Sequence, residues 1–174
     1  MRTINVNPNL LTKKMIRAST IDTFELLHRN RSLPPQLRCV WYSINQAFRK
    51  RIAHLEITPN QYTLLRWLSE THHKGLSQRE LADLMASDPN TITSLLNRME
   101  AKGLIQRDVH ENDRRAYRII IKPAGRKLFE KAHPVALKLQ KEVLGHMSKP
   151  ERERFLEQLA GIAQACRQAL DNSD

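Results

Sequence analysis

The chain of 174 residues contains little cysteine and little glycine, and both shortages limit the chemistry it can perform. Its two cysteines, Cys39 and Cys166, are far apart and form no CxxC pair, which argues against a disulfide framework and against a thiolate zinc site. With 5 glycines there is no glycine-rich loop for a phosphate, and no nucleophile elbow or metal-ligand cluster occurs. We therefore expect no enzyme activity, no cofactor and no bound metal.

Long hydrophobic runs are missing as well. No apolar stretch approaches the roughly 18 residues of a membrane span, and the N-terminal residues have no apolar core like that of a secretory signal. The 7 histidines form no H-x-x-x-H pair and have no obvious carboxylate at ligand spacing. These absences predict a cytoplasmic protein without a membrane partner.

Positive charge is abundant. Lysine and arginine number 29 against 18 acidic residues, so the formal net charge is +11 and the pI is near 10.1. Such a balance favours polyanionic partners, either nucleic acid or an anionic membrane surface, although a surface tuned for solubility is a third explanation. The charge alone does not choose among these, so the choice depends on local motifs.

Apolar residues at spacings of three and four predict a mostly helical chain. The local signals for helix starts are capping boxes and prolines at the first helical position. These starts are Pro34–Pro35, Thr58–Gln61, Ser77–Glu80, Asp88–Pro89 and Ser148–Glu151.

Two β-strands are expected after Gly103, which suits a left-handed helix end. Leu104–Val109 carries β-branched residues, and Tyr117–Ile121 alternates apolar with polar side chains except at Ile120. The charged segment His110–Arg115 lies between them and predicts a hairpin turn. Six cations surround this hairpin and are expected to contact phosphates: Lys102, Arg107, Arg118, Lys122, Arg126 and Lys127.

Two short helices followed by a basic hairpin form the layout of a winged helix-turn-helix. The first helix would act as a brace, and the second would lie in the major groove of DNA with its apolar side, Ile92–Met99, turned away. Its other side carries short polar and cationic groups, where a merely solvated helix face more often has Glu and Lys. Its positive N-terminal end also suits a phosphate.

At the hairpin turn, Arg114 and Arg115 could enter the minor groove, where narrow A·T tracts are most negative. Asp113 would hold one guanidinium in place, and an ordinary charged surface turn is the alternative. The expected DNA-binding residues are Ser77, Gln78, Asn90, Thr91, Thr93, Ser94, Asn97, Arg98, Asp113, Arg114 and Arg115.

The segment Asp113–Gly125 resembles the wing signature of the MarR family, D-x-R followed five residues later by L-T-x-x-G. The stretch from Leu81 to Ile105 looks like that family's recognition helix and the start of its first wing strand, and the similarity spans roughly Pro34–Asp171. The resemblance implies a homodimer in which the first and the last two helices interlock. Each lobe would bind half of a pseudopalindromic operator.

The resemblance also implies roles for single residues. Asp113 and Arg115 match the family's wing pair, which makes Arg115 the minor-groove residue with Arg114 beside it. Lys122 stands where the family usually has a threonine that caps the next helix, and Pro123 follows at the first turn.

We therefore predict a mainly α fold with a small β-hairpin wing, a winged helix-turn-helix with N- and C-terminal dimerisation helices. Residues 1–33 are an N-terminal extension, partly helical; 34–57 and 122–174 are dimerisation helices; and 58–121 form the DNA-binding domain. The predicted function is a sequence-specific, double-stranded DNA-binding transcriptional regulator, acting as a ligand-responsive repressor. A metal- or redox-responsive regulator of the same fold, and a winged-helix module that binds protein, stay open as alternatives.

Proteins of the MarR family commonly release DNA when a small phenolic or carboxylate ligand binds between their dimer-forming and DNA-binding parts. The resemblance therefore implies an effector, and aromatic side chains beside arginines would suit a small aromatic or carboxylate molecule. Packing of Trp41 and Tyr62 in the core is the alternative. Cys39 lies later in its helix than the reactive cysteine of the peroxide-sensing branch and is expected to be inert, and Cys166 is expected in the core. The candidate ligand residues are Arg38, Trp41, Tyr42, Asn45, Tyr62 and Arg66.

Overall fold

The computed structural model describes residues 32–71, 75–110 and 113–172, and the chain divides into two compact units, residues 1–43 and 44–174. The predicted extension therefore lies outside the described residues up to position 31. In the first unit the described part is the beginning of helix α2 (Leu33–Ile52), where Leu37, Val40 and Trp41 are exposed. The remainder of α2 belongs to the second unit.

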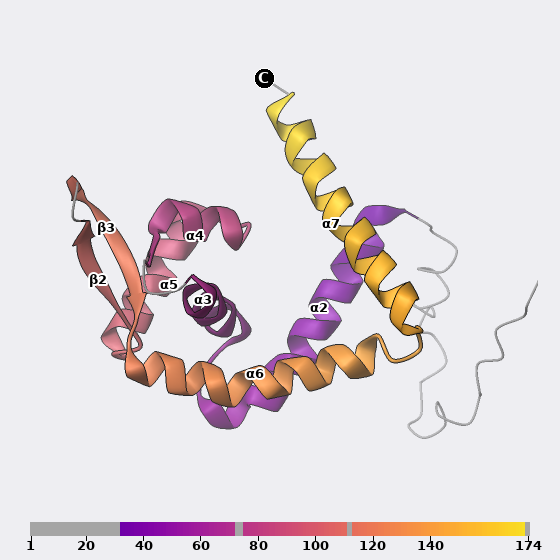
Figure 1. The fold of residues 1–174 in the computed structure, drawn as a ribbon, viewed down its shortest axis with the longest axis horizontal. Coiled ribbons are helices and arrows are strands. Elements are labelled where there is room, and N and C mark those ends of the chain that lie inside the picture. Colours follow the sequence, from indigo (N-terminus) through magenta and orange to yellow (C-terminus); the bar gives the residue numbers. More distant parts are fainter. Residues whose placement is uncertain (1–31, 72–74, 111–112, 173–174) are drawn as a thin grey trace, which may run out of the picture. The chain divides into compact units, whose positions relative to one another are not determined.

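The second unit is mostly helical with one small sheet, which confirms the predicted fold class (Figure 1). After α2 come η2 (Ala53–Leu55), α3 (Pro59–Glu70), β1 (Leu76–Ser77), α4 (Gln78–Leu84), α5 (Pro89–Ala101), β2 (Ile105–His110), β3 (Asp113–Ile121), α6 (Pro123–Val143) and α7 (Lys149–Asp171).

Local capping explains where these helices begin. The Thr58 side chain accepts a hydrogen bond from the Gln61 amide at 3.3 Å, while the Gln61 side chain accepts one from the Thr58 amide at 2.9 Å. The same reciprocal box opens α4 at Ser77 and Glu80. Each box satisfies helix N–H groups that have no partner within the helix, so the predicted starts of α3 and α4 are confirmed.

The sheet has one strand more than the predicted hairpin. Its order is β1-β3-β2 with antiparallel pairing, and Ile119 of β3 lies between Leu76 of β1 and Arg107 of β2. Strand β3 also begins earlier than predicted, because Asp113 pairs with His110 beyond an irregularity in the ladder. The turn is therefore shorter than the predicted segment 110–115.

Gly75 precedes β1 with a φ of +64°. A Cβ atom there would lie 2.8 Å from the carbonyl oxygen of Ile119, so both backbone angle and space require glycine at this position.

The core of the second unit consists of two clusters that share Leu128 and Phe129 of α6. The first cluster joins α3, α4, α5 and the sheet, and it includes the predicted apolar side of α5. The buried residues of this cluster are Leu64, Leu65, Leu68, Leu76, Leu81, Ala82, Ile92, Leu95, Leu96, Met99, Leu104, Ile105 and Ile119. The second joins α2, α3 and α6: Phe48, Ile52, Ile57, Tyr62, Ala132 and Leu139. Burial on this scale fixes which side of α5 is left to solvent.

Close backbone packing requires glycine at position 125, in the first turn of α6. A Cβ atom at this position would overlap the backbone carbonyl oxygen of Leu104, which also accepts the Lys122 amide at 3.0 Å. Lys122 itself makes no side-chain cap bond, and Pro123 occupies the first helical turn. The start of α6 is therefore set by close backbone packing rather than by a capping hydroxyl.

Helix α7 buries no residue within the described chain. Its large apolar side chains Phe155, Leu156, Ile162 and Leu170 are exposed. Its apolar residues are interrupted by charges, and no helix in the described ranges has the length and apolarity to cross a membrane. An apolar helix surface of this kind normally marks an interaction site.

Candidate nucleic-acid interface

The polar side of α5 is open to solvent. Asn90, Thr91, Ser94, Asn97 and Arg98 are all exposed, opposite the buried stripe that begins at Ile92. The predicted division of this helix into a buried and an open side therefore matches the structure. The open side offers hydroxyl, amide and guanidinium groups to a partner.

Thr93 is only half exposed, and its hydroxyl is already engaged. It donates to the carbonyl oxygen of Pro89 at 2.8 Å and accepts from the Gln78 side-chain nitrogen at 2.8 Å. A hydroxyl has one proton, so Thr93 retains only acceptor capacity. The Gln78–Thr93 bond links the start of α4 to α5, and it leaves the Gln78 carbonyl oxygen as an acceptor.

The N-terminus of α5 carries a negative charge of its own. One carboxylate oxygen of Asp88 accepts the Thr91 amide at 2.9 Å, and hydrogen bonds from Thr91 hold the Asp88 pKa below its ordinary value. The carboxylate already complements the helix dipole at this end. The phosphate contact expected there would meet this charge, so the exposed side chains are better placed to bind DNA than the helix terminus is.

Two arginines expected at phosphates are paired inside the protein. Arg107 of β2 donates to Glu100 and to Asn97, both on α5. Arg118 of β3 donates to the Glu80 carboxylate at 3.1 Å and to the Gly75 carbonyl oxygen at 3.2 Å. These bonds attach the strands of the wing to both helices of the helix-turn-helix.

Lys102, a third predicted phosphate partner, donates to the Glu56 carbonyl oxygen at 3.1 Å. Three of the six predicted cations thus have partners within the described residues, and sequence reasoning missed all three partners.

The wing residues Asp113, Arg114 and Arg115 form the first part of β3. The side chains of residues 109–116 lie outside the described structure. The pairing of Asp113 with Arg115 and the reach into the minor groove stay predictions.

The predicted ligand residues divide between the two units. Arg38, Trp41 and Tyr42 lie on the first part of α2, where the two aromatic side chains are 63% and 60% exposed. Asn45, on the later part of α2, and Tyr62 and Arg66, on α3, belong to the second unit.

Tyr62 is a core residue. It is 6% exposed, its hydroxyl is 3.0 Å from Nδ1 of His133, and its ring lies against Phe48 and Phe129. Burial raises the Tyr62 pKa. The alternative of core packing thus describes Tyr62, and His133 is a partner that local sequence patterns did not reveal.

Arg66, four residues further along α3, donates to the Glu70 carboxylate at 2.8 Å, and this bond raises the Arg66 pKa. The pair is about half exposed, so the guanidinium remains accessible on one side.

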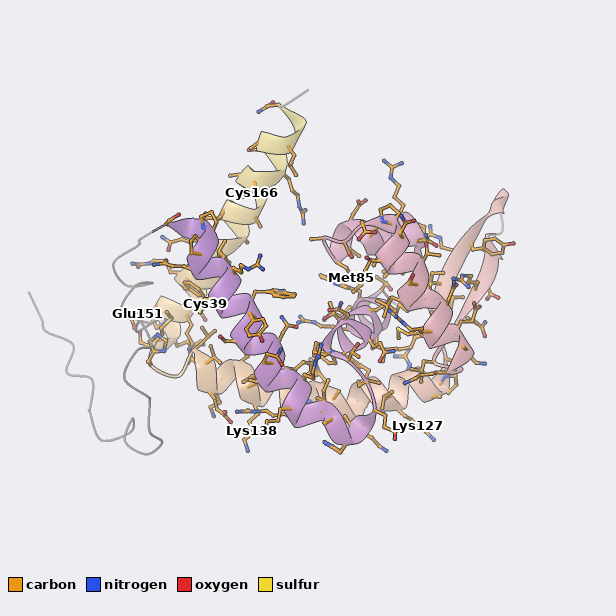
Figure 2. The ribbon with its side chains drawn as sticks, turned by 180° about the vertical axis from the view of Figure 1, so that it is seen from behind. Cys39, Met85, Lys127, Lys138, Glu151 and Cys166 are labelled. Carbon is orange, nitrogen blue, oxygen red and sulfur yellow. The ribbon has the colours of Figure 1, made fainter. Side chains whose placement is uncertain are left out.

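The two cysteines lie on different helices, Cys39 on α2 and Cys166 on α7 (Figure 2). Cys166 is exposed, so its predicted place in the core is wrong for the single chain, because α7 buries none of its residues there. Within the described ranges no three His, Cys, Asp or Glu residues gather as a metal site would require.

Two linked helices, a polar face on the second of them and an attached antiparallel wing define the winged helix-turn-helix class of DNA-binding proteins. Residues 57–117 match the model of the MarR family. A protein of Thauera aromatica, assigned as a regulatory protein for the hcr operon, is 30% identical over 134 residues, which cover 75% of this chain and 80% of the relative.

Solved structures agree with this match. The DNA complex of Staphylococcus aureus MepR is similar with a TM-score of 0.71 and 22% identity, over 78% of this chain and 96% of that chain. A structure of Bordetella bronchiseptica BpsR, described in connection with 6-hydroxynicotinic acid, has a TM-score of 0.69 and 22% identity, over 76% and 94%. The chain belongs to the MarR family; it is a DNA-binding transcriptional regulator and not an enzyme.

Proposed function

We propose that this regulator is a cytoplasmic repressor that binds a pseudopalindromic operator as a homodimer and releases it when a small aromatic or carboxylate effector binds. The observation that carries the proposal is the exposed polar side of α5, which includes Asn90, Ser94 and Asn97. One helix fills the major groove, where base edges offer a distinct pattern of donors and acceptors. The MepR neighbour was solved as a complex with DNA, which supports DNA binding by this fold.

In this proposal the helix-turn-helix and the wing have separate tasks. Ser77, the N-cap of α4, and Gln78, its first residue, contact the DNA backbone beside the groove, while the side chains of α5 read base edges. Arg115 enters the minor groove with Arg114 beside it, and Asp113 restrains the guanidinium. The internal bonds of Arg107 and Arg118 keep the wing and both helices in one fixed arrangement.

Selection of bound DNA from genomic fragments tests the function and yields the operator with its half-site spacing. Affinity for the selected operator is expected to fall steeply with salt, because each phosphate contact releases counterions. Binding that ignores both salt and DNA sequence would contradict the proposal.

Two substitutions separate the wing from the reading helix. Arg115→Ala is expected to lower operator affinity by on the order of 2 kcal/mol, as expected for a charge-assisted contact. Lys138→Ala removes the same charge from α6, outside the helix-turn-helix and wing (Figure 2), and is expected to have little effect. Thr93→Ala is expected to change sequence preference, because it removes a hydroxyl from α5, whose side chains read base edges.

The homodimer is supported by apolar surface on α2, α6 and α7. Side chains normally found in cores are exposed there: Leu33, Leu37, Val40, Trp41, Leu137, Val143, Phe155, Leu156, Ile162 and Leu170. Ile162→Glu places a charge among the exposed apolar side chains of α7, which would disfavour their burial in a dimer. Sedimentation of this variant is therefore expected to show monomers. Gln168→Glu adds a charge on the opposite side of the same helix and is expected to leave the dimer intact. A monomeric wild-type protein at micromolar concentration would refute the dimer.

The effector is supported by the exposed aromatic residues of α2 and by the accessible side of Arg66. In the BpsR neighbour, 6-hydroxynicotinic acid, which is an aromatic acid, is connected with the regulation of DNA binding. Calorimetry with a panel of aromatic acids is expected to find a ligand whose affinity falls in Arg38→Ala or Arg66→Ala. Glu70→Gln removes the ion pair with Arg66 but keeps the arginine, so it tests whether a loss of ligand affinity in Arg66→Ala comes only from the lost ion pair. No binding across the panel would refute this part.

A further inference from the structure

Arg107 makes two hydrogen bonds from one strand of the wing to one side of α5. Its Nη1 donates to the Glu100 carboxylate, and its Nη2 donates to Oδ1 of Asn97 at 2.7 Å. The Arg107 side chain is only 24% exposed, and Glu100 neutralises its charge at close range. The guanidinium thus spans two positions three residues apart on α5.

The chemistry of the guanidinium decides which end of the Asn97 amide faces it. Arginine has only donors, so the atom it contacts must be the amide oxygen. The Asn97 nitrogen, with two N–H donors, is then directed away from Arg107. Asn97 is exposed, and its nitrogen donates to no other residue in the described part of the chain.

We propose that Arg107 is a positioning residue for sequence reading: it holds Asn97 with its two N–H donors toward the DNA. The inference rests on the proposed function and deepens it, because it states what Asn97 recognises. Donors complement acceptor atoms, namely guanine O6 and N7, adenine N7, thymine O4 or a phosphate oxygen, and they do not complement the cytosine amino group. The two-bond pairing of Asn with adenine needs the amide oxygen as well, and Arg107 already uses one of the two lone pairs of that oxygen.

A direct phosphate contact is the competing role for Arg107. Its charge is already paired with Glu100, and its two terminal nitrogens each hold a bond within the protein. A phosphate could therefore use only the remaining N–H donors of Arg107, and it would meet the negative charge of Glu100 beside them. The two roles make different predictions for a double substitution.

The test is a double-mutant cycle of Asn97→Ala and Arg107→Ala, measured on the operator selected by the wild type and on every single base-pair variant of it. Each single substitution is expected to weaken binding roughly tenfold, the loss of one good hydrogen bond, and the double substitution is expected to add little. Both are expected to lose discrimination at the same base pairs. A shared loss without altered discrimination would overturn the role in sequence reading, because Asn97 would then contact a phosphate, which carries no sequence information.

Arg107→Lys separates geometry from charge. Lysine keeps the charge but has no planar fork to hold Glu100 and Asn97 together, so this variant is expected to match Arg107→Ala. Additive losses of roughly a hundredfold in the double variant, or full rescue by lysine, would overturn the inference. Because discrimination is a ratio between two DNAs measured with one protein, partial unfolding does not alter it.

The two proposals can fail separately. If the wild type selects no DNA sequence, the proposed function fails. If it selects an operator but the cycle is additive, only the role of Arg107 fails.

Discussion

Substitution of Gly125 by alanine reverses a general rule and is therefore a strict test of the close packing at the start of α6. In an exposed helix, Gly→Ala stabilises by about 1 kcal/mol. At Gly125 the added Cβ overlaps the Leu104 carbonyl oxygen and lies 3.1 Å from a side-chain carbon of Ile121. The obstacle is backbone, so the helix or the strand must move.

The cost follows from what must move. Overpacking of this kind costs roughly 1–3 kcal/mol. The Leu104 oxygen also accepts the Lys122 amide, and weakening that bond costs about 1 kcal/mol, similar to the gain in helix propensity. We expect Gly125→Ala to lower the free energy of unfolding by about 1–3 kcal/mol.

Urea denaturation at one fixed protein concentration measures this change. Gly161→Ala is the matched control, because it makes the same replacement inside α7, where the new Cβ has no atom within 4 Å apart from its chain neighbours and the nearby backbone of the same helix. That control is expected to stabilise by up to about 1 kcal/mol. If Gly125→Ala is as stable as the wild type or more stable, the reasoning from close backbone packing is refuted.

Three further predictions concern single side chains. The Asp88 pKa is lowered on folding, so its stabilisation is present above the ordinary value of 3.8 and disappears as pH falls below it. Asp88→Asn keeps a cap and is expected to reduce the loss of Tm in acid, and an unchanged acid profile would contradict this. Lys122→Thr supplies the missing cap and is expected to stabilise by about 1 kcal/mol in chemical denaturation, whereas Lys122→Ala should not. Tyr62→Phe keeps the ring but removes the bond to His133, and is expected to cost about 1 kcal/mol; equal stability would show the bond contributes nothing.

Local chemistry made the helix starts predictable. The boxes at Thr58 and Ser77 and the cap at Asp88 each use a side chain three residues from its partner, so the sequence contains the whole interaction. The buried side of α5 was predictable for the same reason, because helical spacing places Ile92 and Met99 together.

Long-range pairing was not predictable in this way. The strand of Leu76 and Ser77 exists only because β3 pairs with it. The partners of Arg107 and Arg118 depend on the register of the hairpin, which the sequence does not reveal. For this reason both arginines were predicted to contact phosphates. After α4, Ala86 has a left-handed conformation with a φ of 47°. This conformation was not predictable, because it usually occurs at glycine and the residue here is alanine.

The sheet order has a consequence for how the protein is made. Its middle strand, β3, is the last of the three in the chain, so β1 and β2 both wait for the residues around Ile119. During synthesis, α4 and α5 leave the ribosome before the strand that joins their flanking strands exists. A chain arrested before Ile121 would therefore expose Leu76 and Ile105 with unpaired strand edges, and the sheet is complete only once β3 has been made.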